Sequence, residues 1–304
     1  MQIKSLSNGL SGAGVDLYLN EKQLYVKKYV LTTSGASTLI EQAEIMRSWN
    51  NYLIRVPYII DSGSNANYPF YIDMEYIEGD TLCHSFSNPN IKNSRDHNLY
   101  RKILVQYMLE LIEHSHSSTE SNLYDLALSK LKLITSNIKS RETSEKDYFN
   151  LHLVSIVESH FHKHRNTIKL LSSNSKHNSV HGDLTLSNVI VAKGDMIFID
   201  PIHHYLGNNI FADYFKLIFD LEFGLSFKVE RNFAPIKTSI SLYILKVNHA
   251  LKQIFTDRFM FLSEVEHLFI IVEALRVLQY QDSQTKLATS LSCYIESKLR
   301  RNDA

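Results

Sequence analysis

Residues 180–201 read VHGDLTLSNVIVAKGDMIFIDP, and the fold prediction depends on this stretch more than on any other. Two short runs of mainly apolar and β-branched residues, 188–191 and 196–199, stand on either side of Ala192-Lys193-Gly194-Asp195. A Gly/Asp turn between two runs of this kind is typical of a β-hairpin. The sequence therefore predicts two short antiparallel strands joined by a tight turn.

Polar side chains stand at the open ends of this predicted hairpin. Asp183 and Asn188 precede or begin the first strand, and Asp200 follows the second. Because a hairpin brings its open ends together, we expect these three side chains to converge. Two carboxylates and an amide suit Mg²⁺, which in proteins takes carboxylates together with substrate phosphates. An ordinary hairpin with polar ends is the alternative interpretation.

The order His181-Gly182-Asp183, then Asn188, then Asp200 after the hairpin resembles the catalytic loop and metal-binding segment of the protein-kinase-like fold. The spellings HGD and IDP, in place of HRD and DFG, look like the branch of aminoglycoside phosphotransferases and choline kinases, whose substrates are small-molecule alcohols. The resemblance implies an α+β, bilobal fold. Residues 1–79 would form an N-lobe with a small antiparallel sheet, and residues 80–304 a mainly helical C-lobe.

The same resemblance implies cofactors and roles. ATP and Mg²⁺ would be bound, Asp183 and Asn188 would be catalytic, and Asn188 and Asp200 would hold the metal. His181 would brace the loop rather than take part in the chemistry.

Composition sets the broad class of the protein. The chain has 304 residues, of which 44% are hydrophobic and 21% charged, as in globular proteins. The chain has 32 basic residues (Lys and Arg) and 32 acidic residues (Asp and Glu). Its net charge therefore creates no overall electrostatic attraction to nucleic acid or to an anionic membrane. Cys83 and Cys293 are isolated, and we expect a reduced compartment. The sequence shows neither a signal peptide nor a membrane span, which predicts a cytoplasmic protein of undetermined oligomeric state.

The N-terminal part begins with a glycine-bearing turn. Gly9, Gly12 and Gly14 lie among polar residues, ahead of two alternating runs at 15–19 and 23–30. Backbone N–H groups of such a turn can approach phosphates, although the spacing is neither GxxxxGK[ST] nor GxGxxG. The turn resembles the Ser-Gly-Ala loop of antibiotic phosphotransferases, which implies nucleotide contacts from Ser11 and Gly12.

The second of these runs carries two adjacent lysines. Tyr25 and Lys27 share one face of the predicted strand, and Val26 and Lys28 share the other. One lysine should neutralise the nucleotide phosphates, and the family places an adenine contact two positions before it. That pattern favours Lys27, with Tyr25 under the adenine, while Lys28 remains the alternative. Two solvated strand lysines are the other interpretation.

Residues 37–53 have helical periodicity and carry Glu41 and Glu44. The kinase-like fold needs a helical glutamate that holds the phosphate lysine through a charge-assisted bond. Ile45, four residues after Glu41, matches the apolar position of the family, so Glu41 is preferred over Glu44. Either residue alternatively serves as a solvated helix charge.

Two further strands are predicted at 56–60 and 69–76. The second ends in Met74-Glu75-Tyr76-Ile77-Glu78-Gly79, which resembles the hinge between the lobes. The resemblance implies that Met74, Tyr76 and Ile77 contact adenine, and that Gly79 lets the chain bend into the next lobe.

Helical patterns dominate the remainder of the chain. About a dozen residues separate Asp200 from Asp213, which opens an apolar helix. Protein kinases need a long segment there to hold a peptide, so the short segment favours a small-molecule acceptor. His203, His204 and Tyr205 either touch that substrate or form a solvated loop. The absence of a dense acidic cluster in the sequence disfavours aminoglycosides.

We therefore expect an ATP-dependent kinase that phosphorylates a hydroxyl of a sugar, amino alcohol or related metabolite. The alternatives are a protein kinase or kinase-like toxin acting on a protein hydroxyl, and an inactive kinase-fold binding module. The sequence does not decide between ATP and GTP as the donor.

Overall fold

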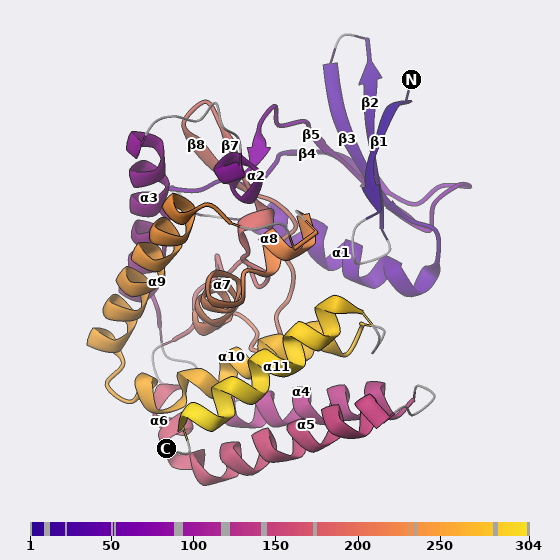
Figure 1. Ribbon diagram of the computed structural model, residues 1–304. Coiled ribbons are helices and arrows are strands. Elements are labelled where there is room, and N and C mark those ends of the chain that lie inside the picture. The colour runs from indigo at the N-terminus through magenta and orange to yellow at the C-terminus, as the bar shows by residue number, and fades with distance from the viewer. Residues whose placement is uncertain are drawn as a thin grey trace. The chain divides into compact units, whose positions relative to one another are not determined.

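The computed structural model describes residues 2–8, 13–21, 23–49, 51, 53–87, 94–116, 122–140, 145–172, 175–230, 232–233, 236–281 and 285–302. The chain forms two compact units (Figure 1). The sheet unit comprises Met1–Ile103 and Asn178–His204, and the helical unit comprises Leu104–His177 and Tyr205–Ala304. Residues 180–201 thus belong to the same compact unit as the N-terminal sheet. The predicted division at Gly79 stays a prediction.

The larger sheet of the sheet unit is antiparallel, in the order β1-β2-β3-β5-β4. Its strands are β1 (Gln2–Asn8), β2 (Gly14–Asn20), β3 (Gln23–Val30), β4 (Ile59–Gly63) and β5 (Phe70–Glu75). Two of them depart from expectation. The sequence did not predict β1, and β4 begins three residues later than the predicted 56–60, where Pro57 lacks the N–H that a ladder needs.

One helix, α1 (Thr33–Ser48), packs on β3, β4 and β5. Leu39, Ala43 and Met46 on its buried stripe face the sheet unit's core. The helix ends five residues before the predicted end at 53. The side-chain oxygen of Asn51 accepts hydrogen bonds from the backbone N–H groups of Leu53 and Ile54, both at 2.9 Å, and this local turn replaces the last helical turn.

The second sheet of this unit has the order β6-β7-β8. It contains β6 (Asp80–Thr81) and the predicted hairpin, β7 (Val189–Ala192) and β8 (Asp195–Phe198). Lys193 and Gly194 form the turn, with φ of 52° and 92°. Positive φ at both central residues defines the tight turn whose twist matches that of the strands. The short helix α2 (Leu82–Ser87) packs beside β6 and β7.

The helical unit is built around α7 (Phe211–Phe223), in which every residue except Glu222 is buried. Aromatic side chains hold this helix: Phe215 stacks on Phe269 at 4.6 Å between centroids, and Tyr214 stacks on Phe255 at 3.9 Å. The other helices are α3 (Ser94–Glu113, shared with the sheet unit), α4 (Leu123–Lys139), α5 (Glu145–Lys163), α6 (Arg165–Leu171), α8 (Leu225–Glu230), α9 (Thr238–Arg258), α10 (Leu262–Leu278) and α11 (Lys286–Asn302).

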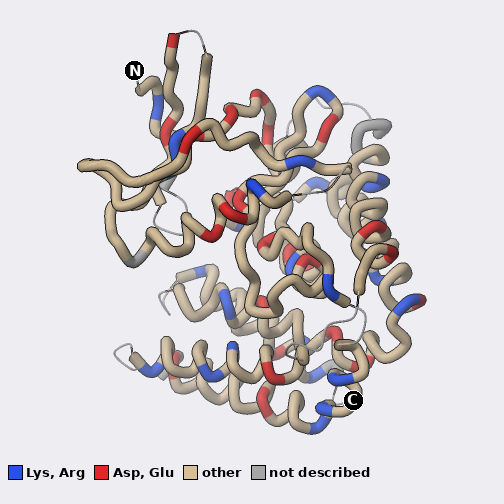
Figure 2. The backbone as a smooth tube through the Cα atoms, turned by 180° about the vertical axis from the view of Figure 1, so that it is seen from behind, with Lys and Arg blue, Asp and Glu red and all other residues tan. Residues whose placement is uncertain are grey.

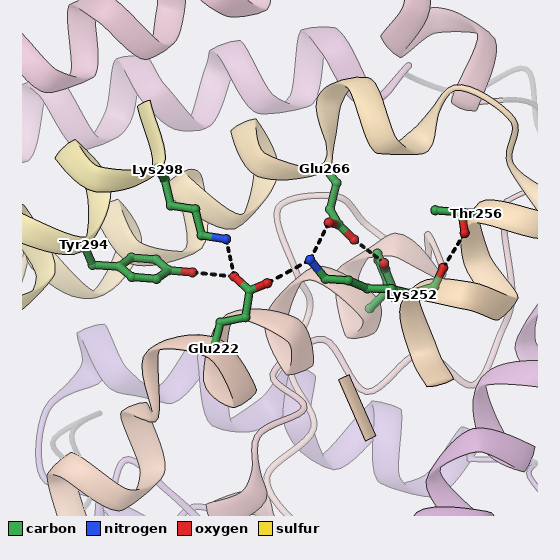
Figure 3. Close-up of polar contacts among 7 residues, drawn as sticks. Glu222, Lys252, Thr256, Glu266, Tyr294 and Lys298 are labelled. Atoms are coloured by element: carbon green, nitrogen blue, oxygen red, sulfur yellow. Dashed lines mark hydrogen bonds and ion pairs between the residues drawn. The ribbon is translucent and has the colours of Figure 1, made fainter. Parts of the chain in front are cut away.

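Glu222 joins four of these helices through a polar network (Figure 3). Its carboxylate accepts from Lys252 of α9 at 2.8 Å, from Tyr294 of α11 at 2.9 Å and from Lys298 of α11. Lys252 also lies 2.8 Å from Glu266 of α10. Burial alone raises the pKa of Glu222, but the hydrogen bonds and charges of the two lysines outweigh it and lower that pKa to about 2.

Charged residues of both signs are interspersed along the described chain (Figure 2). This pattern agrees with the equal numbers of acidic and basic residues. Across the described residues, we find no helix with both the length and the apolar character needed to span a bilayer.

Candidate active site

The loop before β7, which is the predicted catalytic loop, brings Asp183 and Asn188 together. A short 3-10 turn, Leu186–Asn188, ends the loop and aims the Asn188 side chain back along it. Its amide nitrogen lies 2.8 Å from the backbone oxygen of Asp183 and 3.1 Å from the carboxylate Oδ2 of the same residue. Both partners are acceptors, so the Asn188 nitrogen is the donor. These two bonds therefore use the nitrogen of the Asn188 amide and not its oxygen.

His181 braces this loop from inside the sheet unit, where it is fully buried. The backbone N–H of Asp183 donates to its Nδ1 at 3.2 Å, which leaves Nε2 as the protonated nitrogen. Nε2 lies 2.8 Å from the backbone oxygen of Ile199 and donates to it. The imidazole also packs edge-on against Trp49 and Phe198, at 6.4 and 5.3 Å between centroids. These contacts give His181 a positioning role.

Asp200 follows β8 in a left-handed conformation, with φ of 60°. The N–H of the preceding Ile199 donates to the backbone oxygen of Asn188 at 3.0 Å, so the two expected metal ligands are tied through adjacent backbone. The Asp200 carboxylate lies 2.8 Å from Nζ of Lys28. The Lys28 side chain is only 8% exposed, whereas that of Asp200 is 42% exposed. The lysine is thus fixed while the carboxylate stays accessible.

The two faces of the larger sheet separate the predicted nucleotide contacts. Lys28 lies opposite Ile72 and shares its face with Met74, the cross-strand partner of Val26. Tyr25 and Lys27 lie on the other face. There Nζ of Lys27 lies 2.5 Å from Asp73 and 3.9 Å from the ring centroid of Tyr71. Lys27 and Met74 therefore cannot contact one nucleotide from the same side of the sheet.

The face with Tyr25 carries a cavity of about 660 Å³. It is lined by Asn20, Glu21, Gln23, Tyr25, Ile60, Asp61 and Asp73. Burial raises the pKa of Asp73 and Lys27 opposes that rise. A hydrogen bond to Asp61 raises the pKa of Tyr71 to about 12. Asp183, Asn188 and Asp200 do not line this cavity.

The helix α1 presents a different side chain from the one expected. Glu41 and Glu44 are both exposed, and among the described residues neither pairs with Lys27 or Lys28. Gln42 is instead buried, at 3% exposure, and its Nε2 donates to the backbone oxygen of Pro201 at 3.1 Å. The prediction missed Gln42. Its spacing from Leu39 and Met46, on one helical stripe, was the available signal.

The other predicted nucleotide contacts are Ser11, Gly12, Tyr76 and Ile77, and Gly79 is the predicted bend. Ser11 and Gly12 lie outside the described residues. Tyr76 and Ile77 follow β5, the first half-buried and the second buried. Gly79 packs against β7, where an added Cβ would collide with the backbone oxygen of Val191. Close packing therefore also explains a glycine at this position.

Comparison of the structure with solved structures identifies the fold. The chain superposes on an apo form of aminoglycoside phosphotransferase APH(4)-Ia with a TM-score of 0.65 and 11% identity, over 99% of this chain and 94% of that one. A ternary complex of the same enzyme with ADP and hygromycin B gives a TM-score of 0.61 at 10% identity, covering 100% of this chain and 94% of that one.

Two further neighbours have the same architecture. A putative fructosamine-3-kinase from Haemophilus somnus 129PT gives a TM-score of 0.61 at 12% identity, over 98% of this chain and 91% of that one. Choline kinase LicA from Streptococcus pneumoniae gives a TM-score of 0.55 at 13% identity, over 99% of this chain and 93% of that one. No protein-family model matches the sequence, and no curated protein sequence matches it.

The chain therefore has the protein-kinase-like fold in the form found in small-molecule kinases. The predicted α+β class and the predicted resemblance are confirmed.

Proposed function

We propose that the protein transfers the γ-phosphoryl group of ATP to a hydroxyl group of a small molecule. The observation that carries this proposal is the arrangement of two polar pairs in the sheet unit. Asn188 holds Asp183, Lys28 holds Asp200, and the bond from Ile199 to the Asn188 backbone links the pairs. Base, metal ligands and a phosphate-neutralising cation are the parts that phosphoryl transfer requires.

Asn188 and Asp200 fit a magnesium ion. The Asn188 nitrogen is committed to Asp183, so the Asn188 oxygen would be the atom that holds the cation, and the Asp200 carboxylate is partly exposed. One amide and one carboxylate oxygen, completed by phosphates and water, is a donor set that Mg²⁺ accepts. Asn188 and Asp200 would hold the ion, which would supply electrostatic stabilisation of the negative charge that develops during phosphoryl transfer.

The remaining roles follow from position. Asp183 would orient the acceptor hydroxyl and accept its proton, held in place by the Asn188 amide. We assign the phosphate contact to Lys28 rather than Lys27. Lys28 contacts Asp200, a proposed metal ligand, and it lies on the same face of the sheet as Met74. Lys27 is paired with Asp73 on the other face.

The adenine and phosphate contacts are also proposals. Met74 lies on the face of Lys28, and we retain it with Tyr76 and Ile77 beside the adenine. Ser11 and Gly12 stay proposed phosphate contacts.

The choice of a small acceptor rests on two observations. The structural neighbours include a phosphotransferase solved with ADP and hygromycin B, a putative fructosamine-3-kinase and a choline kinase. In addition, the segment between Asp200 and α7 is short, which leaves little chain to hold a peptide.

A screen of hydroxyl-bearing metabolites for stimulated ADP release tests the proposal. Removal of a general base costs about 10²- to 10⁴-fold in rate, so Asp183→Ala should nearly abolish the stimulated turnover. Labelling of a protein in place of a metabolite would indicate a protein kinase. Nucleotide binding without transfer to any acceptor would indicate a binding module.

A further inference from the structure

The segment around Asp200 is held in an unfavourable backbone conformation. A non-glycine residue at φ of 60° is strained, although aspartate tolerates this region better than most residues. Such conformations persist where the surroundings over-determine them. On one side of Asp200, Ile199 is fixed by its bonds to Asn188 and His181, at 3.0 and 2.8 Å. On the other side, the N–H of Ile202 donates to the backbone oxygen of His181 at 2.9 Å.

The peptide directly after Asp200 is anchored from α1. Gln42 donates to the backbone oxygen of Pro201 at 3.1 Å, across 159 residues of sequence. Pro201 has no N–H, so its carbonyl is the one backbone group at this residue that a hydrogen bond can hold. The donor is 3% exposed and sits between Leu39 and Met46 on the buried stripe of α1, which fixes its orientation.

The neutral amide suits this position better than a glutamate would. A carboxylate at position 42 cannot donate, so it would set an acceptor against the Pro201 carbonyl. Lys28 already has a counter-ion, because its ammonium lies 2.8 Å from Asp200. The described residues of α1 add no acid to this pair, since Glu41 and Glu44 are exposed.

We propose that Gln42 is a positioning residue for the metal-binding aspartate. The helix α1 then acts on Asp200 through the Pro201 backbone, and not on the phosphate lysine through a glutamate ion pair. This inference rests on the proposed function, because it assigns Asp200 to Mg²⁺. Its consequence is specific: loss of the Gln42 donor weakens the response to Mg²⁺ more than the affinity for nucleotide.

Two variants remove the donor in different ways. Gln42→Glu keeps the size and adds a charge, whereas Gln42→Leu keeps the approximate size without charge. We expect each to raise the Mg²⁺ concentration for half-maximal binding of ADP about tenfold or more, from the loss of one buried hydrogen bond. Gln23→Glu, the same chemical change at an exposed position of β3, is the matched control and should leave that concentration unchanged.

Binding is measured without any acceptor, through tryptophan fluorescence. Trp49 is the single tryptophan of the chain, and it packs against His181 and Phe198 at 6.4 and 6.3 Å between centroids. Melting temperatures are recorded in parallel for all variants. A lower melting temperature with an unchanged Mg²⁺ requirement would reduce Gln42 to a structural residue and overturn the proposal.

A Gln42→Glu variant that needs less Mg²⁺ than the wild type would also overturn it, since a glutamate would then suit the site. If the wild type binds no magnesium nucleotide, the proposed function fails, and this inference with it. If the wild type binds and the Gln42 variants match it, the inference alone fails.

Discussion

Replacement of Lys28 by methionine should impair catalysis far more than the same change at Lys27. The two lysines are adjacent in sequence, lie on opposite faces of β3 and differ in their partners. Lys28 contacts Asp200, while Lys27 contacts Asp73. Methionine retains most of the aliphatic length in both variants, so the pair isolates the effect of the ammonium group.

The expected magnitude follows from the contacts that are lost. A hydrogen bond to a charged group contributes about 1.5–3 kcal/mol, and 1.4 kcal/mol corresponds to a factor of ten. If Lys28 makes one such bond to the nucleotide phosphates in the transition state, Lys28→Met should lower kcat/KM by about 10- to 150-fold. Lys27→Met should change kcat/KM by less than about threefold.

Lys27→Met should instead lower the melting temperature. Burial raises the pKa of Asp73 and Lys27 opposes that rise, so the variant leaves a mostly buried carboxyl group without its counter-ion. The assay is acceptor-stimulated ADP release over a range of Mg·ATP concentrations, with a thermal melt of each variant. A loss of kcat/KM in Lys27→Met equal to or greater than that in Lys28→Met would refute the assignment of Lys28.

Two further predictions concern the catalytic loop and the helical unit. Gly182→Ala should lose most activity, because φ is 80° at this residue and an added Cβ would collide with the Ile202 carbonyl. Gly194→Ala is the comparison, because φ is 92° there but the space around it is open. It should lose about 1–2 kcal/mol of stability and keep its activity. Equal activity losses in the two variants would count against the loop geometry. Glu222 has a pKa of about 2 in the folded protein, against an ordinary value of 4.5. The ionised carboxylate therefore stabilises the folded state by about 3 kcal/mol. This contribution is complete above pH 4.5 and is lost as the pH falls toward 2. Urea unfolding should therefore show Glu222→Gln to be less stable than the wild type at pH 7, with the gap narrowing at pH 3; a constant gap would contradict the low pKa.

The sequence sufficed to predict the hairpin of β7 and β8 because its geometry is local. A tight turn with flanking β-prone runs forces the ends of the hairpin together, and Asp183, Asn188 and Asp200 stand at those ends. The bounds of β3 also agree with the predicted 23–30.

The orientation of β3 was harder to predict. Alternation separates Lys27 from Lys28, but it does not say which face turns toward Asp200. A usable signal was present, since Leu24, Val26 and Val30 share the face of Lys28, and aliphatic residues mark the covered side of a sheet. The resemblance to the family favours Lys27, which lies on the other face.

The helix contact was missed for a similar reason. The kinase-like pattern requires a charged residue on α1, and both candidates, Glu41 and Glu44, are exposed. Gln42 lies with Leu39 and Met46 at helical spacing, yet a polar residue on an apolar stripe does not reveal its partner. That partner, the Pro201 carbonyl, depends on tertiary structure over 159 residues.

Transfer of labelled γ-phosphate from ATP to a mixture of small hydroxyl compounds tests the central claim most directly. We predict Mg²⁺-dependent label in a low-molecular-mass product with the wild type and with Asp195→Asn, an exposed change on the same hairpin. Asp183→Asn and Asp200→Asn should each lose that transfer. Undiminished transfer in Asp200→Asn, or label that appears in protein alone, would contradict the account.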